Sequence, residues 1–91
     1  MIVYRSKQFD KSLKKILLSG NIKLSKIEEV IGILSNEKII PKQYNHHALK
    51  GDWLGYRECH IQTDLLLIYK IEKDKLILIL INIGNHSQLF R

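Results

Sequence analysis

The second half of the chain contains three strand-like runs that are joined by very short connections. Each run is rich in β-branched and aliphatic residues, and turn residues separate the runs at Gln62-Thr63 and at Glu72–Lys75. Connections this short can join antiparallel strands, but they leave no room for the crossover that parallel strands need. We therefore expect an antiparallel meander with strands at Gly55–Ile61, Asp64–Ile71 and Leu76–Ile83.

The first half of the chain predicts one strand followed by two helices. Residues 2–4 are β-branched and aromatic, and Ser6 is a suitable N-cap for an amphipathic helix that ends near Gly20. A second amphipathic stretch covers residues 22–34. We expect an α+β fold in the order β-α-α-β-β-β, with two N-terminal helices packed on a twisted antiparallel sheet. Because the chain is too short for two hydrophobic cores, residues 1–91 are expected to form one domain.

Residues 36–48 interrupt this pattern between the helical half and the strand half. They lack periodicity and contain Pro41 and two adjacent histidines, His46 and His47. Such a segment predicts a loop laid over the surface. Loops of this kind often contain functional residues.

Side chains alternate between the two faces of a strand, so the run at residues 55–61 divides into two sets. The face that we expect to be the more open one carries Tyr56, Glu58 and His60, and the opposite face carries Arg57, Cys59 and Ile61. The other two runs are apolar at both alternating positions. This pattern predicts that the helices cover one face of the sheet and that the other face is at least partly closed.

The charge of the chain favours an anionic partner. It has 15 lysines and arginines against 9 aspartates and glutamates, a net charge of +6 at pH 7. Such a balance attracts nucleic acid or an acidic protein.

Cys59 is the single cysteine, so no disulfide can form within the chain. No secretory signal or apolar run of about 20 residues is present, so we expect a cytoplasmic protein without membrane contact.

Four histidines in so short a chain suggest acid–base chemistry: His46, His47, His60 and His86. Imidazole titrates near neutral pH, so it can take a proton from a ribose 2′-OH or give one to a leaving 5′-oxygen. These two transfers are the chemistry of metal-free RNA cleavage. For His46 a simple solvent-exposed position in the loop is the competing interpretation, and His60 could equally be a packed, hydrogen-bonded histidine.

A metal site is the rival use of a histidine cluster, with Asp64 and Cys59 as further candidate ligands. The sequence lacks the spacings that hold zinc, and Cys59 and His60 are neighbours on a strand and so face opposite ways. A glycine-rich phosphate loop and a Gly-x-Ser-x-Gly elbow are also missing. We therefore expect neither a metal nor a cofactor.

Cations and aromatic rings near the histidines could bind RNA. Lys50 and Arg57 could offset charge on a phosphate in the transition state. Trp53, Tyr56 and Phe90 could stack on a nucleobase, although a tryptophan in a small domain more often belongs to the core.

Four linked motifs resemble the YafQ branch of the RelE-like toxins, members of the RelE/ParE superfamily. The motifs, in chain order, are His47–Trp53, Gly55–His60, Asp64–Tyr69 and Gly84–Phe90. The resemblance implies a RelE-like fold and a type II toxin–antitoxin toxin. It further implies a ribosome-dependent, metal-independent endoribonuclease that cleaves mRNA by attack of the 2′-OH on the phosphate and so stops translation.

The resemblance also implies roles for single residues. His86, in the Gly-x-His-x-x-Leu-Phe tail, is expected to be the general acid, and Phe90 is expected to stack near the substrate. His47, His60 and Asp64 are expected to share proton transfer, orientation and phosphate contact, and which of the three is the base is left open.

One position departs from the family pattern. Related sequences commonly carry an arginine four residues before the tail histidine, where this chain has Asn82. A weak or degenerate RelE-fold protein that binds its antitoxin or RNA without cleavage is therefore the alternative function. A plain nucleic-acid-binding domain is a third possibility, but helix-turn-helix and aromatic RNA-binding signatures are missing.

The partners implied by the resemblance are a cognate antitoxin protein, and mRNA on the ribosome together with rRNA. Operator DNA is expected only indirectly, through the complex with the antitoxin. The positive charge of the chain suits both RNA and an acidic antitoxin segment, so the two are expected to compete.

Overall fold

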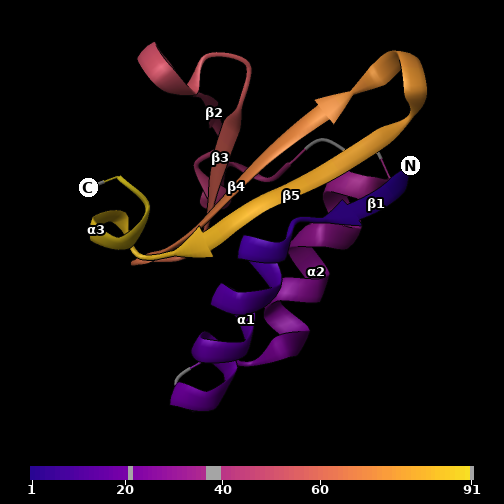
Figure 1. Ribbon diagram of the computed structural model, residues 1–91. Helices are drawn as coiled ribbons and strands as arrows, with labels where there is room; N and C mark the ends of the chain where they lie inside the picture. The colour runs from indigo at the N-terminus through magenta and orange to yellow at the C-terminus, as the bar shows by residue number, and fades with distance from the viewer. Residues whose placement is uncertain (21, 37–39, 91) are drawn as a thin grey trace.

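The computed structural model describes residues 1–20, 22–36 and 40–90. Strands and helices follow in the order β1 (Ile2–Arg5), α1 (Lys7–Ser19), α2 (Leu24–Ser35), β2 (His47–Ala48), β3 (Arg57–Gln62), β4 (Leu65–Glu72), β5 (Ile77–Gly84) and α3 (His86–Leu89). Three single turns of 3₁₀-helix, η1 (Lys42–Tyr44), η2 (Gly51–Trp53) and η3 (Lys73–Lys75), lie between them. The α+β class and the expected element order are confirmed, and the chain adds the short elements β2 and α3 (Figure 1).

The five strands form one sheet in the order β1-β5-β4-β3-β2. Strands β3, β4 and β5 form the expected antiparallel meander, with boundaries one or two residues from those expected. Strand β1 pairs with β5 in parallel, so the sheet is mixed and not wholly antiparallel. The reason is topological: the helix pair and the whole meander separate β1 from β5, so this pairing is not limited by a short turn.

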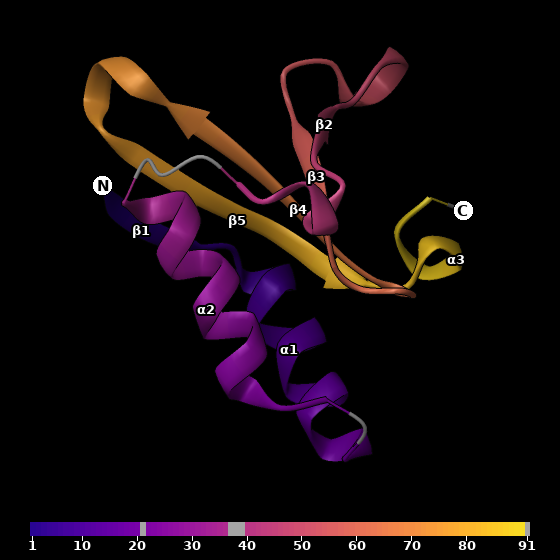
Figure 2. The same ribbon diagram turned by 180° about the vertical axis from the view of Figure 1, so that it is seen from behind.

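Helices α1 and α2 cover one face of the sheet, as Figure 2 shows from behind. Phe9 of α1 and Ile27 and Val30 of α2 are fully buried there against the inward side chains of the strands. The segment at residues 36–48 is not simply laid over the surface, because Tyr44 is 3% exposed and belongs to this core. Residues 37–39 of that segment lie outside the described part of the chain.

Cys59 also faces this core and is completely buried. Burial raises the pKa of its thiol to about 12, and the negative charge of Glu58 acts in the same direction. The thiol is therefore protonated at neutral pH.

The opposite face of the sheet is closed only in part, as expected. A second, smaller hydrophobic cluster lies there, formed by Leu66, Ile68 and Leu89 and by the partly buried Leu49, Trp53, Tyr56, Ile81 and Phe90. These residues come from β4, β5, the segment around η2 and the C-terminal α3. The cluster joins the end of the chain to the sheet on the face that carries His60.

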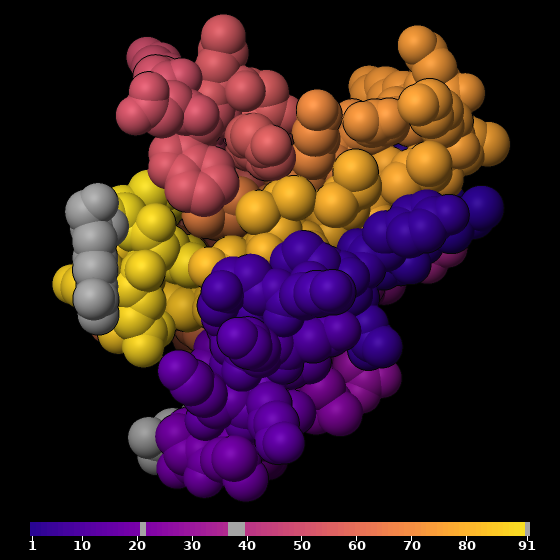
Figure 3. Space-filling view, in the orientation of Figure 1, coloured from indigo at the N-terminus to yellow at the C-terminus, as the bar shows by residue number. Residues whose placement is uncertain are grey.

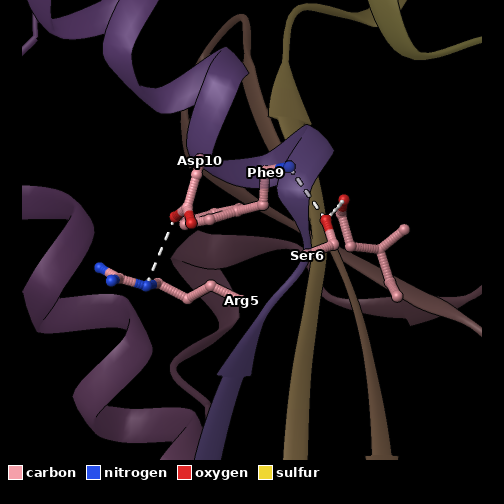
Figure 4. A network of polar contacts seen from close by, with 5 residues as sticks. Arg5, Ser6, Phe9 and Asp10 are labelled. Carbon is pink, nitrogen blue, oxygen red and sulfur yellow. Dashed lines mark hydrogen bonds and ion pairs between the residues drawn. The ribbon is translucent and has the colours of Figure 1, made fainter.

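Ser6 couples the start of α1 to the sheet. Its hydroxyl accepts a hydrogen bond from the Phe9 backbone N–H at 2.9 Å and donates one to the Ile81 carbonyl at 2.6 Å (Figure 4). The nearby ion pair between Arg5 and Asp10, at 3.4 Å, is half exposed or more on both sides and contributes little to stability.

We expect Ser6→Ala to lower the free energy of unfolding by about 1–2 kcal/mol, because it removes an N-cap and leaves a carbonyl without its donor. Urea denaturation measures the change. Ser25→Ala is the matched control, since Ser25 is exposed near the start of α2. Equal midpoints for the two variants would contradict this role for Ser6.

Helix α1 has 13 residues and is the longest helix in the described part of the chain. None of the helices described is both long enough and apolar enough to cross a membrane.

Candidate active site

A glutamate between two histidines forms the centre of the site. Strand β2 pairs with β3 so that His47 lies directly opposite Glu58. The Nε2 atom of His47 lies 2.8 Å from the Oε1 atom of Glu58, and the Nε2 atom of His60 lies 3.8 Å from the same oxygen. The first distance is short enough for a hydrogen bond donated by the imidazole, whereas the second is too long for one.

The three side chains differ in their access to solvent. The Glu58 side chain is 8% exposed, that of His60 is 30% exposed and that of His47 is 49% exposed. The sequence placed Glu58 on the more open face. The face is right, but Glu58 itself is buried because β2 adds to the edge of β3 and sets His47 against it. A buried carboxylate is stable only with polar partners, and the two imidazoles are its partners here.

The pairing of the strands places His60 near the C-terminal helix. His60 lies opposite Leu66, and Leu66 lies opposite Gly84, so the three residues form one row across β3, β4 and β5. Neighbouring strands are about 4.8 Å apart, which separates the backbones of His60 and Gly84 by roughly 10 Å across the sheet. His86 follows Gly84 by two residues.

Helix α3 is fixed over this row by local contacts. Asn85 and Gln88 form a reciprocal capping box, with hydrogen bonds of 2.8 and 2.9 Å between each side chain and the other residue's backbone N–H. A Cβ atom on Gly84 would lie 2.8 Å from Oε1 of Gln88, so a larger residue there would displace the Gln88 side chain from the capping box. The buried Leu89 anchors the far side of the helix in the second cluster.

These contacts leave His86 exposed at the first position of α3. Its ring lies 5.1 Å from that of Phe90, between centroids, and the planes are tilted by 42°. Phe90 in turn makes an edge contact with Trp53 at 5.9 Å, and Trp53 makes one with Tyr56 at 5.6 Å. The aromatic candidates therefore form one continuous row that ends at His86. Figure 3 shows the segment around η2 lying against the C-terminal α3 on the surface.

Asp64 is exposed in the turn between β3 and β4. Figures 1 and 2 both show this turn beside α3 and the end of β5. No ion pair or hydrogen bond joins the Asp64 carboxylate to another residue in the described ranges. It thus lies at the same end of the sheet as His86 but outside the cluster around Glu58.

The two candidate phosphate ligands lie in different elements, Lys50 after β2 and Arg57 in β3. Lys50 is exposed just after β2, at the N-cap of η2. Arg57 points to the face opposite Glu58, as the alternation in β3 requires, and its Nη2 atom lies 3.1 Å from Nδ1 of His46. The structure therefore separates Arg57 and His46 from the two histidines that flank Glu58.

Asn82, at the position where the family resemblance led us to expect an arginine, links the sheet to α1. Its side-chain oxygen accepts hydrogen bonds from the Ser12 hydroxyl at 2.7 Å and from the Ile83 backbone N–H at 2.8 Å. It lines a cavity beside α1 together with Lys15 and Gln88. The side chain of Asn82 thus connects elements and supplies no positive charge.

His47, Glu58 and His60 also form a group that could hold a metal ion, since their ligand atoms lie within 4.8 Å of one another. Two imidazoles and a carboxylate suit zinc or copper. Of the ligands suggested by the sequence, Cys59 faces the opposite core, and Asp64 is not part of this group.

Glu58 is the residue that the sequence analysis did not select. It had been placed on the same face as His60, two positions away, but its pairing with His47 depends on β2, a strand of only two residues. A carboxylate that shares a strand face with a histidine is the signal that could have identified it.

Comparisons with known proteins identify toxins of one family as relatives of this chain. The profile of a family described as bacterial toxin of type II toxin-antitoxin system, YafQ, matches residues 1–91. The mRNA interferase toxin YafQ of Escherichia coli K12 is 35% identical over 86 residues, which cover 93% of this chain and 90% of that protein. A YafQ toxin of Haemophilus influenzae is 46% identical over 67 residues, which cover 71% of this chain and 66% of that protein.

Solved structures show the same fold. A copper-bound mutant toxin from Helicobacter pylori has a TM-score of 0.91 and 39% identity, and the match covers 99% of both chains. A chain of the Escherichia coli DinJ–YafQ complex has a TM-score of 0.83 and 30% identity, covering 98% of this chain and 97% of that one.

Proposed function

Because this chain belongs to the YafQ family of type II toxin–antitoxin toxins, we propose that it is an mRNA interferase that cuts mRNA on the ribosome. The observation that supports an enzyme most directly is the buried Glu58 between His47 and His60, on the face and at the end of the sheet where α3 presents His86. This arrangement supports a mechanism in which one of these groups accepts a proton and another donates one.

The reaction that suits these groups is attack of a ribose 2′-OH on the adjacent phosphate. The 2′-oxygen forms a bond to phosphorus, the bond to the 5′-oxygen breaks, and the products are a 2′,3′-cyclic phosphate and a free 5′-OH. One group must accept the 2′-OH proton and another must protonate the leaving oxygen. No metal is required for either transfer.

We assign the acceptor to His60. Its imidazole is partly exposed and close to the Glu58 carboxylate without being bound to it, so it can take a proton. Glu58 then stabilises the imidazolium that forms, as a carboxylate beside a catalytic histidine does in general. His47 is held by its hydrogen bond to Glu58 and can direct its other edge to the phosphate. Asp64, at the rim, would contact the RNA without accepting this proton.

We assign the donor to His86, which is exposed at the start of α3. Phe90 is in tilted contact with its ring, which would restrict the orientation of the imidazole, and together with Trp53 it offers a surface for stacking a base. Lys50 is the exposed cation nearest in sequence to His47 and would neutralise a phosphate. Arg57 would have to leave His46 and reach round β3 to do the same.

We infer two macromolecular partners from the family. One is the ribosome with its mRNA, to which the net charge of +6 is suited. The other is an antitoxin protein, as in the DinJ–YafQ complex of E. coli, with operator DNA bound only through that complex.

The proposal is tested by induced expression in a bacterial host, with mapping of mRNA 5′ ends. We expect growth arrest and new ends in phase with the codons, both suppressed when the antitoxin is expressed as well. New ends without codon phase would contradict ribosome dependence but not cleavage.

Asn82 supports the alternative function, a toxin fold that binds its antitoxin or RNA without cutting, because it supplies no charge for the phosphate. In the same experiment this alternative predicts normal growth and intact mRNA from well-expressed protein that still binds the antitoxin.

A divalent metal is expected to inhibit the enzyme. The relative from H. pylori binds copper, and in this chain His47, Glu58 and His60 offer a fitting set of ligands. An ion bound there would occupy the groups that we assign to proton transfer. We expect Cu²⁺ to bind with one ion per chain and to reduce cleavage, with binding weakened at least tenfold in His47→Ala, since one of three ligands is lost. Asp64→Asn is the matched control, and weaker copper binding in that variant would place the ion elsewhere.

A further inference from the structure

A second pocket lies on the face of β3 and β4 opposite the candidate active site. Its volume is about 440 Å³, and Arg57 and Tyr69, which pair across the two strands, both line it. The remaining lining residues are Ile40, His46, Gly55, Ile71 and Lys73. The lining thus combines three side chains that are or can become positively charged, His46, Arg57 and Lys73, with two aliphatic ones, Ile40 and Ile71.

Tyr69 has a buried hydroxyl with no hydrogen-bond partner in the described part of the chain. The residue is completely buried, and burial raises the pKa of its hydroxyl, while the nearby Arg57 guanidinium opposes this rise. Tyr69 and Arg57 both line the pocket, so the hydroxyl and the guanidinium belong to the same site. A buried polar group without a partner costs free energy, so a ligand atom that accepts a hydrogen bond from this hydroxyl would be stabilised here.

The cations around this hydroxyl are arranged to receive an anion. The Nη2 atom of Arg57 lies 3.1 Å from Nδ1 of His46 beside the pocket, and Lys73 also lines it. Among the described residues that line the pocket there is no carboxylate to pair with these cations.

We propose that this pocket binds the carboxylate of an acidic side chain in a peptide segment of the antitoxin. The carboxylate accepts hydrogen bonds from the Arg57 guanidinium and the Tyr69 hydroxyl, and an apolar neighbour in the peptide packs on Ile40 and Ile71. The identity of the partner rests on the proposed function, whereas the chemistry of the pocket does not.

The lining favours a peptide over RNA. An RNA phosphate would match the cations but would leave Ile40 and Ile71 without an apolar partner. The pocket also lies on the far side of the sheet from His60 and Glu58, so RNA bound at the active site would have to pass round the edge of the sheet. An acidic segment with apolar residues satisfies both halves of the pocket.

The test is a titration of the folded protein with N-acetyl-glutamyl-leucinamide, followed by the NMR signals of the Arg57 side chain and of the Gly55 and Tyr69 amides. The matched control ligand is the glutaminyl analogue, which has the same shape without the charge. Uridine 3′-monophosphate tests RNA as the source of the anion. We expect local shifts with millimolar affinity for the glutamyl peptide and at least tenfold weaker binding of the other two.

Two variants locate the binding. Tyr69→Phe and Arg57→Gln should each weaken the glutamyl peptide about tenfold, the cost of one hydrogen bond to a charged group. Lys14→Gln, an exposed position on α1, should have no such effect. Equal binding of the two peptides, preference for the nucleotide, or unchanged affinity in both pocket variants would each overturn the proposal.

The test of the pocket can be distinguished from the test of mRNA cleavage. Tyr69→Phe should cleave mRNA as the wild type does, because Tyr69 faces away from His60 and Glu58. Intact cleavage without peptide binding overturns only the pocket, and peptide binding in a chain that does not cleave overturns only the proposed function.

Discussion

Replacing His86 with alanine is expected to abolish growth arrest and to lower the rate of mRNA cleavage by about 10²–10⁴-fold, the usual contribution of a general acid. The 5′-oxygen is a poor leaving group unless it is protonated, and His86 is the imidazole that α3 holds exposed beside the His60 row. The measurement is single-turnover cleavage of mRNA on purified ribosomes, at matched protein concentration.

Ser87→Ala is the control for His86→Ala. Ser87 is the next residue in α3 and is also exposed, so its replacement perturbs the same helix without removing an imidazole. We expect Ser87→Ala to stay within about threefold of the wild-type rate. If His86→Ala does so as well, His86 does not transfer the proton, and the exposed end of α3 serves only to bind RNA.

The fold could be predicted where a local pattern decides the structure. The meander follows from two short turns, and α1 follows from the N-cap Ser6 and from Gly20, which takes the left-handed conformation with φ of 76° at the end of the helix. The parallel pairing of β1 with β5 joins segments about 75 residues apart, and no local pattern records the partner or direction of a strand.

The sequence identified most residues of the candidate site, but it did not predict how they are arranged. The sequence and its family resemblance placed His47, His60 and His86 together, and the strand register supports this grouping by aligning His60 with Leu66 and Gly84. Glu58 was missed because its environment depends on β2, which is too short to show periodicity.

The position of Arg57, unlike the environment of Glu58, could be predicted from the alternation of side chains along the strand. This alternation predicts that Arg57 lies on the face away from His60, and the structure agrees. Proximity in sequence had suggested a shared phosphate. On a strand, adjacent residues are divided between two faces, so the same short segment contributes to the catalytic face and to the pocket around Tyr69.

Glu58→Gln is expected to lower cleavage by about 10²-fold or more while leaving the protein folded. Glutamine keeps the shape of the side chain and an oxygen that can accept the hydrogen bond from His47. It removes the negative charge that stabilises the imidazolium on His60 after the 2′-OH has lost its proton. Single-turnover cleavage gives the rate, and thermal unfolding shows whether the fold is retained.

Comparison with His60→Ala shows whether Glu58 acts through His60 or independently of it. If Glu58 acts through His60, the two single variants and the double variant should all be slow to a similar extent, because residues that act as a unit have non-additive effects on the rate. If the losses multiply, Glu58 contributes independently of His60 and accepts the proton itself. A Glu58→Gln variant that unfolds at the wild-type temperature and cleaves at the wild-type rate would reduce Glu58 to a partner that only positions His47.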